Sequence, residues 1–236
     1  MRCLFLESGM YVNTQGKLSP CCIYNDPNSD VFVEDLENYL GSQEILATRD
    51  MLDRDIWPSG CYNCKRDEEL GVLSLRQQSL VELKIPPDQL VIDFALGNLC
   101  NSDCVMCFPL SSSRVASRLQ QHKKNYIKVD ASWCEKNEFW QKLTELLPKI
   151  HRLRFQGGEP FLNKKLWKWL KSKEVNQIKH KINLHITTNA SYLENSSINV
   201  LEDWNRLVIN ASIDATGKNF EWIRHGLNWE TVEKMF

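Results

Sequence analysis

The sequence predicts an α/β protein built on a parallel sheet. Apolar runs at 90–96, 151–155, 182–188 and 207–213 have the length and composition of buried strands. The segments between them place apolar residues at helical spacing, which gives each segment one apolar face. Because strands and helices alternate at least three times, we expect right-handed crossovers and parallel strand pairing.

Each predicted helix depends on a short set of apolar positions. The first has Phe139, Trp140, Leu143, Leu146 and Leu147, the second has Leu166, Trp169 and Leu170, and the third has Ile198, Leu201 and Trp204. Asn163 and either Ser196 or Ser197 stand where N-cap residues are expected. Residues 229–236 look like the start of one more helix.

The chain changes character at residues 85–88, which read Ile-Pro-Pro-Asp. Residues 1–86 are rich in turn-forming residues and show little regular patterning apart from a short acidic helical stretch near 34–40 and an expected helix near 44–52. Residues 87–236 carry the strand and helix alternation. We therefore predict two parts, a small cysteine-rich module over 1–86 and an α/β core over 87–236.

Composition places the chain among ordinary globular proteins. Of its 236 residues, 42% are hydrophobic and 25% are charged. No apolar run reaches the ~18–20 residues of a membrane span, and Arg2 and Glu7 interrupt the apolar start, so we expect neither membrane insertion nor a signal peptide. The predicted location is the cytoplasm.

Charge is unevenly distributed, with −8 over residues 1–100, +10 over 101–181 and −3 over 182–236. A basic middle could attract nucleic acid. Its lysines instead recur on predicted solvent-facing helix surfaces, as in 163–171, so a nucleic-acid partner is not expected.

Nine cysteines are the strongest chemical signal. They are Cys3, Cys21, Cys22, Cys61, Cys64, Cys100, Cys104, Cys107 and Cys134. In a chain without a secretory signal, such clustering favours metal binding over disulfides. After the first predicted strand, Cys100, Cys104 and Cys107 form a C-x3-C-x2-C pattern. Three thiolates on one loop can hold three corners of a cubane iron–sulfur cluster. The alternative is a zinc site completed by Cys134 or a histidine.

The other predicted strands are also followed by unusual residues. Gly157, Gly158 and Glu159 follow the second strand, Thr188 and Asn189 end the third, and Ser212 and Asp214 end the fourth. Paired glycines allow a ligand to approach the backbone, and Glu159 offers an acceptor for a cationic amine. In parallel α/β folds, ligands gather at the carboxyl ends of the strands.

Taken together, these motifs and the sequence Ile-Arg-His-Gly at 223–226 resemble the radical S-adenosylmethionine (AdoMet) superfamily over residues 90–236. The resemblance implies an α/β partial barrel with a [4Fe–4S] cluster on Cys100, Cys104 and Cys107. It implies that AdoMet chelates the open iron and is cleaved to a 5′-deoxyadenosyl radical, which abstracts a substrate hydrogen. Carried over by position, Gly157, Gly158 and Glu159 would hold the methionine amino group. Asn189 would lie near the methionyl end, Ser212 and Asp214 near the ribose, and Arg224 near the carboxylate.

This sequence departs from the family pattern in two ways. Met106 stands before the last cluster cysteine, where the family commonly has an aromatic residue. The family core is a six-stranded partial barrel, whereas only four strand–helix units fit between residues 87 and 236. We therefore expect an incomplete barrel that lacks its last strands.

The first 86 residues resemble the auxiliary-cluster modules called twitch or SPASM domains, through residues 16–21 and the Cys61-x2-Cys64 pair. The resemblance implies a second iron–sulfur cluster on Cys3, Cys21, Cys61 and Cys64, with Cys22 as an alternate ligand. A structural zinc site on the same thiols is the other interpretation, since C-x2-C does not distinguish zinc from iron. If the chain is extended at residues 21–22, Cys22 points away from Cys21.

The sequence thus predicts a radical AdoMet enzyme whose substrate is a peptide, a sugar or a small molecule. The resemblance implies an electron donor such as a flavodoxin or ferredoxin. The main alternative is an iron–sulfur or zinc module of this fold that holds its metal without turnover. A weaker one is a zinc-bearing nucleic-acid binder that uses the aromatic and basic residues at 167–169. The five histidines show no ligand spacing and are expected at surface or packing positions.

Overall fold

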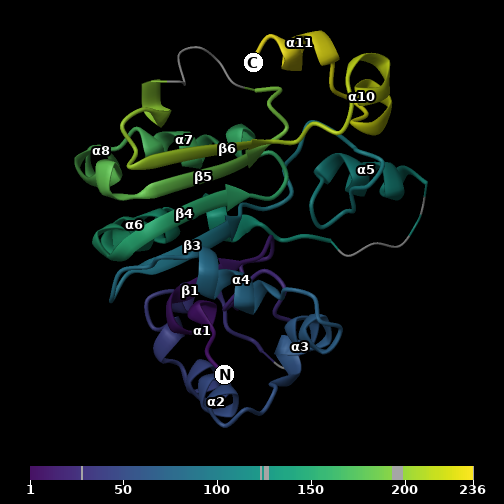
Figure 1. The fold of residues 1–236 in the computed structure, drawn as a ribbon. Coiled ribbons are helices and arrows are strands. Elements are labelled where there is room, and N and C mark those ends of the chain that lie inside the picture. Colours follow the sequence, from purple (N-terminus) through teal and green to yellow (C-terminus); the bar gives the residue numbers. More distant parts are fainter. Residues whose placement is uncertain (28, 123, 125–127, 193–198, 236) are drawn as a thin grey trace.

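The structure, a computed structural model, describes residues 1–27, 29–122, 124, 128–192 and 199–235. Its centre is one sheet of six strands in the order β2-β1-β3-β4-β5-β6. Neighbouring strands are parallel except for the antiparallel pair β1–β2. Figure 1 shows the sheet as a stack from β1 to β6. The strands are β1 (Gly9–Val12), β2 (Leu18–Ser19), β3 (Leu90–Ala95), β4 (Ile150–Gln156), β5 (Asn183–Thr188) and β6 (Arg206–Ala211).

The predicted α/β class with a parallel sheet is confirmed. All four predicted strands are present as β3 to β6, with ends shifted by one or two residues. Strands β1 and β2 lie in the first 86 residues and flank a turn at Gly16, where a hairpin was expected, but the pairing of β1 with β3 was not predicted. They are short, and β1 carries a glycine and a methionine in place of the β-branched run that marks a longer strand.

Helices precede, separate and follow the strands. Asn163 caps α7 as predicted, because its side-chain oxygen accepts hydrogen bonds from the N–H groups of Lys165 and Leu166. The predicted caps Ser196 and Ser197 and the start of the third predicted helix lie outside the described residues, and Asn199–Leu201 form a 3-10 turn. The helices are α1 (Leu4–Ser8), α2 (Gln43–Asp53), α3 (Tyr62–Glu69), α4 (Leu75–Glu82), α5 (Ser113–Gln121), α6 (Asn137–Leu146), α7 (Lys164–Leu170), α8 (Lys173–Ile178), α10 (Gly217–Ile223) and α11 (Trp229–Glu233).

One face of the sheet carries the core. Along β4 and β5, buried apolar residues alternate with more exposed polar ones, so the two strands present one apolar and one polar face. On the apolar face Phe94 stacks on Phe155 with ring centroids 5.8 Å apart and meets the edge of Phe139 at 5.3 Å. Helices α6 and α7 close this face with Trp140 and Trp169.

The first 86 residues share both sheet and core with the rest of the chain. Strand β1 pairs in parallel with β3, and Leu6, Met10 and Val12 belong to the same buried cluster as the residues of β3 and β4. The β1–β2 hairpin packs on Trp133, whose indole N–H donates to the Thr14 carbonyl over 3.2 Å. The change of sequence character at residues 85–88 therefore does not coincide with a break in the core.

The carboxyl ends of the strands face one side of the molecule. In Figure 1 the arrows of β4, β5 and β6 point toward α5 and α10. The loops after β3 and β4 and the ends of β5 and β6 meet there, as expected for a parallel sheet. In the part of the chain that the structure describes, no helix has the length and apolarity needed to cross a membrane.

Candidate functional site

The loop after β3 gathers the three predicted cluster cysteines. The sulfur atoms of Cys100 and Cys104 lie 3.3 and 3.4 Å from the same hydroxyl oxygen, that of Ser102. Cys107 lines the same pocket, and the Cys107 N–H donates to the Cys104 carbonyl over 3.0 Å. All three are free thiols. The C-x3-C-x2-C spacing thus brings three soft ligands to one wall of one pocket.

The glycine turn after β4 lies against the backbone of that loop. A Cβ on Gly158 would stand 2.2 Å from the Leu99 carbonyl oxygen, and a Cβ on Gly157 would stand 2.9 Å from the carbonyl carbon of Ala95. Both glycines have positive φ angles, +86° at Gly157 and +34° at Gly158. The space that the missing side chains leave is therefore filled by the protein's own backbone, a role that sequence reasoning did not assign to them.

The Glu159 carboxylate does not face the pocket. It is 2% exposed and accepts hydrogen bonds from the Thr188 hydroxyl at 2.7 Å, the Asn189 N–H at 2.7 Å and the Phe161 N–H at 3.1 Å. Burial raises the pKa of this carboxyl, and the three hydrogen bonds oppose that shift. Glu159 thus ties the turn after β4 to the end of β5.

The ends of β5 and β6 complete the pocket with polar groups. Asn189 donates from its amide to the side chain of Asn101, over 2.8 Å, and so holds the cysteine loop. Arg224 donates to Asp214 over 2.6 Å, and its Nη1 lies 3.8 Å from the Cys104 sulfur. A guanidinium beside a thiol cluster offers a positive charge to an anionic ligand group.

Of the ten site residues predicted in the α/β core, eight line this one pocket of about 280 Å³, while Glu159 and Asp214 do not line it. Glu159 is turned inward, and Asp214 acts through its ion pair with Arg224. The predicted residues that line it are Cys100, Cys104, Cys107, Gly157, Gly158, Asn189, Ser212 and Arg224, joined by Met106 and Thr188.

Sequence reasoning missed several polar residues within or beside the cysteine loop. Ser102 contacts two of the thiols. Asp103 is buried at 6% exposure and pairs with His225 over 2.7 Å and with Arg118 over 3.5 Å. Both Ser102 and Asp103 lie inside the C-x3-C-x2-C loop, which is the sequence feature that could have identified them, and Ser102 lines the pocket. His225 is exposed, as expected for a surface position, and its pairing with Asp103 was not predicted.

The alternative zinc ligand Cys134 is not part of this pocket. Its buried thiol donates to the Ala131 carbonyl over 3.1 Å and accepts from Asn163 over 3.7 Å. Across the described residues, no three His, Cys, Asp or Glu side chains stand arranged to hold a metal ion. A cubane cluster is less demanding in this respect, because its ligands bind different iron atoms and need not converge on one. The donor set of three free thiols on one wall fits such a cluster.

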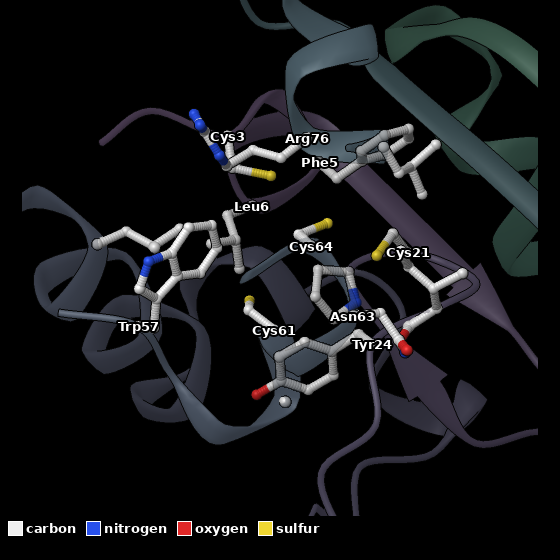
Figure 2. Close-up of a pocket in the computed structure, with 15 residues that line it drawn as sticks. Cys3, Phe5, Leu6, Cys21, Tyr24, Trp57, Cys61, Asn63, Cys64 and Arg76 are labelled. Atoms are coloured by element: carbon white, nitrogen blue, oxygen red, sulfur yellow. The ribbon is translucent and has the colours of Figure 1, made fainter. Parts of the chain in front are cut away.

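A second group of thiols lies among the first 86 residues. Figure 2 shows Cys3, Cys21, Cys61 and Cys64 around one pocket, which Trp57, Tyr24 and Leu6 also line. Its cavity is about 20 Å³ and its walls are almost wholly apolar. Burial raises the pKa of all four thiols, to about 12 for Cys61. Each is therefore held neutral unless a cation compensates the thiolate.

Cys22 lies on a different side of the hairpin. It is exposed, lines another pocket with Tyr11 and Lys17, and interacts with Asp93, Arg154 and Arg152. The side chains of Cys21 and Cys22 thus diverge, although the chain bends at these residues instead of continuing as a strand.

Comparisons with known proteins found structural similarity alone. No family model and no curated protein matches the chain. A structure of anSMEcpe with bound AdoMet has a TM-score of 0.43 at 20% identity, covering 61% of this chain and 38% of that one. SuiB of Streptococcus suis bound to S-adenosylmethionine has a TM-score of 0.44 at 16% identity, covering 85% and 42%. SuiB bound to its precursor peptide SuiA has 0.43 at 15% identity, covering 96% and 51%. The chain spans about two fifths to one half of the length of these proteins.

Proposed function

We propose that the pocket at the carboxyl ends of β3 to β6 binds a [4Fe–4S] cluster and AdoMet, and that the chain is a radical AdoMet enzyme. The supporting observation is the joint placement of three free thiols, the glycine turn and Arg224 around one pocket. When bound and reduced, the cluster would supply the electron that cleaves AdoMet to methionine and a 5′-deoxyadenosyl radical, which would take a hydrogen atom from the substrate. Substrate class stays open among peptides, sugars and small molecules.

The protein's own residues have binding and positioning roles in this proposal. Cys100, Cys104 and Cys107 are the cluster ligands. Arg224, oriented by Asp214, binds the AdoMet carboxylate through charge-assisted hydrogen bonds. The backbone of Gly157 and Gly158 and the side chains of Asn189 and Ser212 hold the methionine and ribose ends. Glu159 acts on the cofactor indirectly, by fixing the turn and the N–H of Asn189.

The test is anaerobic reconstitution of the full chain with iron and sulfide, followed by AdoMet and dithionite. We expect 5′-deoxyadenosine from the wild type and none after replacement of Cys100, Cys104 and Cys107 by Ala. The triple variant should also lose about four irons, the content of one cubane. Cys22→Ser, which changes an exposed thiol outside this pocket, is the matched control. Cleavage of AdoMet by the triple variant would contradict the assignment of these cysteines as cluster ligands. If the wild type binds iron but forms no 5′-deoxyadenosine, the alternative of a non-catalytic iron–sulfur module is favoured.

We also propose that Cys3, Cys21, Cys61 and Cys64 hold a second metal centre, an iron–sulfur cluster, whose ligands bind different iron atoms and need not converge on one ion. The support is that four thiols from separate segments line one apolar cavity. A bound cation would compensate the cost of burying thiolates there. Iron, zinc and sulfide analysis of the triple-alanine variant isolates this centre, because the first site is then absent.

A further inference from the structure

The polar face of the sheet carries a group of arginines on adjacent strands. Strand register places Asp93, Arg154 and His185 side by side in one row across β3, β4 and β5. The neighbouring row holds Arg152, Asn183 and Arg206 across β4, β5 and β6. These residues alternate with buried Leu153 and Phe155, so they lie on the face opposite the aromatic core. We call Arg152, Arg154 and Arg206 the arginine face.

The arginine face has more positive charge than its carboxylate partner neutralises. Asp93 contacts Arg152 at 3.4 Å and Arg154 at 3.6 Å, so one carboxylate serves two guanidiniums. Arg206 is exposed on β6 and adds a third guanidinium close enough to act on His185. Within the described residues, the buried Nε atoms of Arg152 and Arg154 have no hydrogen-bond partner. A buried donor without an acceptor is costly, so Asp93 alone leaves these two guanidiniums incompletely satisfied.

The charges of the same arginines act on His185. Burial, followed by the charges of Arg152, Arg154 and Arg206, lowers the pKa of His185 to about 4. The ring is therefore neutral near pH 7, and its N–H is available as a donor. Asp93 on β3 is the carboxylate in the same row.

The arginine face is adjacent to the proposed cofactor pocket. Thr187 follows His185 on the same face of β5, two residues nearer the carboxyl end, and lines that pocket. At a strand rise of about 3.3 Å per residue, the two positions are about 7 Å apart. A small molecule can thus place one end at the guanidiniums and another at the pocket.

We propose that the arginine face binds an anionic group of the substrate, a phosphate or a carboxylate, while the reacting carbon lies at the cofactor pocket. Planar guanidinium forks match the oxygens of both groups and bind them through two parallel hydrogen bonds. Asp93 orients two of the forks. The inference rests on the proposed function for the reaction, and it narrows the substrate class to acidic molecules.

The test is calorimetric titration of the full chain with inorganic phosphate and, separately, with succinate, at constant ionic strength and without AdoMet or reductant. We expect Arg154→Gln and Arg206→Gln each to weaken binding of the preferred anion about ten-fold. Arg206 is exposed, so its variant keeps the fold even if the Arg154 variant loses it. Arg54→Gln removes the same charge from an exposed helix end and is the control. Tighter binding of phosphate assigns a phosphate group, and tighter binding of succinate assigns a carboxylate.

A second readout follows His185 by NMR. A bound anion should raise the pKa of this ring, and in Arg206→Gln the same rise should need about ten-fold more anion. Absence of binding by both anions, or equal weakening in Arg54→Gln, would overturn the proposal. Cys100→Ala should bind phosphate like the wild type. Anion binding can therefore be measured even if the chain does not cleave AdoMet. Conversely, failure to bind either anion would not contradict the assignment of the cofactor pocket.

Discussion

The Glu159 carboxylate accepts a 2.7 Å hydrogen bond from the backbone N–H of Asn189, which joins the turn after β4 to the end of β5. The same carboxylate also accepts from Thr188 and Phe161. The family resemblance implied that Glu159 contacts AdoMet directly, but its carboxylate oxygens are occupied by hydrogen bonds within the protein. Substitution of Glu159 can therefore distinguish a role in positioning the turn from a role in binding AdoMet.

Glu159→Gln should lower the free energy of unfolding by about 1–3 kcal/mol, because an amide NH2 meets an N–H donor in either orientation. Urea denaturation measures the loss. Glu138→Gln, an exposed carboxylate on α6, should change little. A ten-fold loss of AdoMet affinity with unchanged stability would instead show direct contact with the cofactor.

Gly158→Ala should destabilise the chain more than Gly71→Ala. Both glycines have positive φ, but a Cβ meets no atom within 4 Å at Gly71 and meets the Leu99 carbonyl at Gly158. The difference in unfolding free energy isolates the collision from backbone strain, and we expect about 1–3 kcal/mol. Iron retention should fall in Gly158→Ala alone, since the displaced loop carries Cys100. Equal effects of the two substitutions would mean that the close approach has no energetic importance.

Arg224→Gln should weaken AdoMet binding by roughly ten-fold and leave the iron content unchanged. The guanidinium lies beside Cys104 without being a ligand, so its loss removes a positive charge from the pocket and no thiol. Arg224→Lys should recover part of the affinity. Lys218→Gln removes a charge from the exposed side of α10 and serves as the control. Unchanged affinity in Arg224→Gln would remove this role.

In the Cys100, Cys104 and Cys107 triple-alanine background, Cys21→Ser should release the remaining metal, whereas Cys22→Ser should retain it. Cys21 lines the N-terminal thiol pocket, and Cys22 lies outside it. Metal and sulfide analysis of the two variants provides the measurement. Limited proteolysis should cut residues 1–86 faster in Cys21→Ser. Retention of metal by Cys21→Ser would contradict the second centre.

The wild type should lose stability as the pH falls from about 6.5 toward 4. The pKa of His185 is lowered to about 4 in the folded state, so the unfolded chain binds its proton more readily in that interval. We expect about 1–2 kcal/mol of the loss to come from His185, since water partly screens its half-buried ring. His185→Gln, which cannot take up the proton, should lack this part of the pH dependence in urea titrations at pH 7 and pH 5. Parallel profiles for the two proteins would show that the pKa of His185 is not lowered in the folded state.

The strands after residue 87 could be predicted because each is an apolar run bounded by helical segments, as in 182–188. The β1 strand could not, since its four residues gain their order from pairing with β3 and not from their own pattern. The local pattern of apolar residues carries no information about pairing with a strand distant in the sequence.

For the candidate site, the sequence predicted which residues gather but not how each is used. The cysteine spacing identified the loop, and the parallel topology explains why residues after four strands meet. The direction of the Glu159 side chain depends on the N–H groups of Asn189 and Phe161, which local sequence does not reveal. The arginine face was likewise hidden, because it arises from register between β4, β5 and β6.

Pairing of β1 with β3 has a consequence for the order of events during synthesis. Gly9 leaves the ribosome long before its partner Val91 is made, so β1 waits with one unpaired edge. The four thiols of the N-terminal pocket all belong to the part already synthesised. Metal captured by that nascent segment would hold β1 compact until β3 emerges, because it closes several loops at once. We therefore expect the yield of folded chain to depend on metal supplied during translation. Metal added after purification should give a lower yield of folded chain.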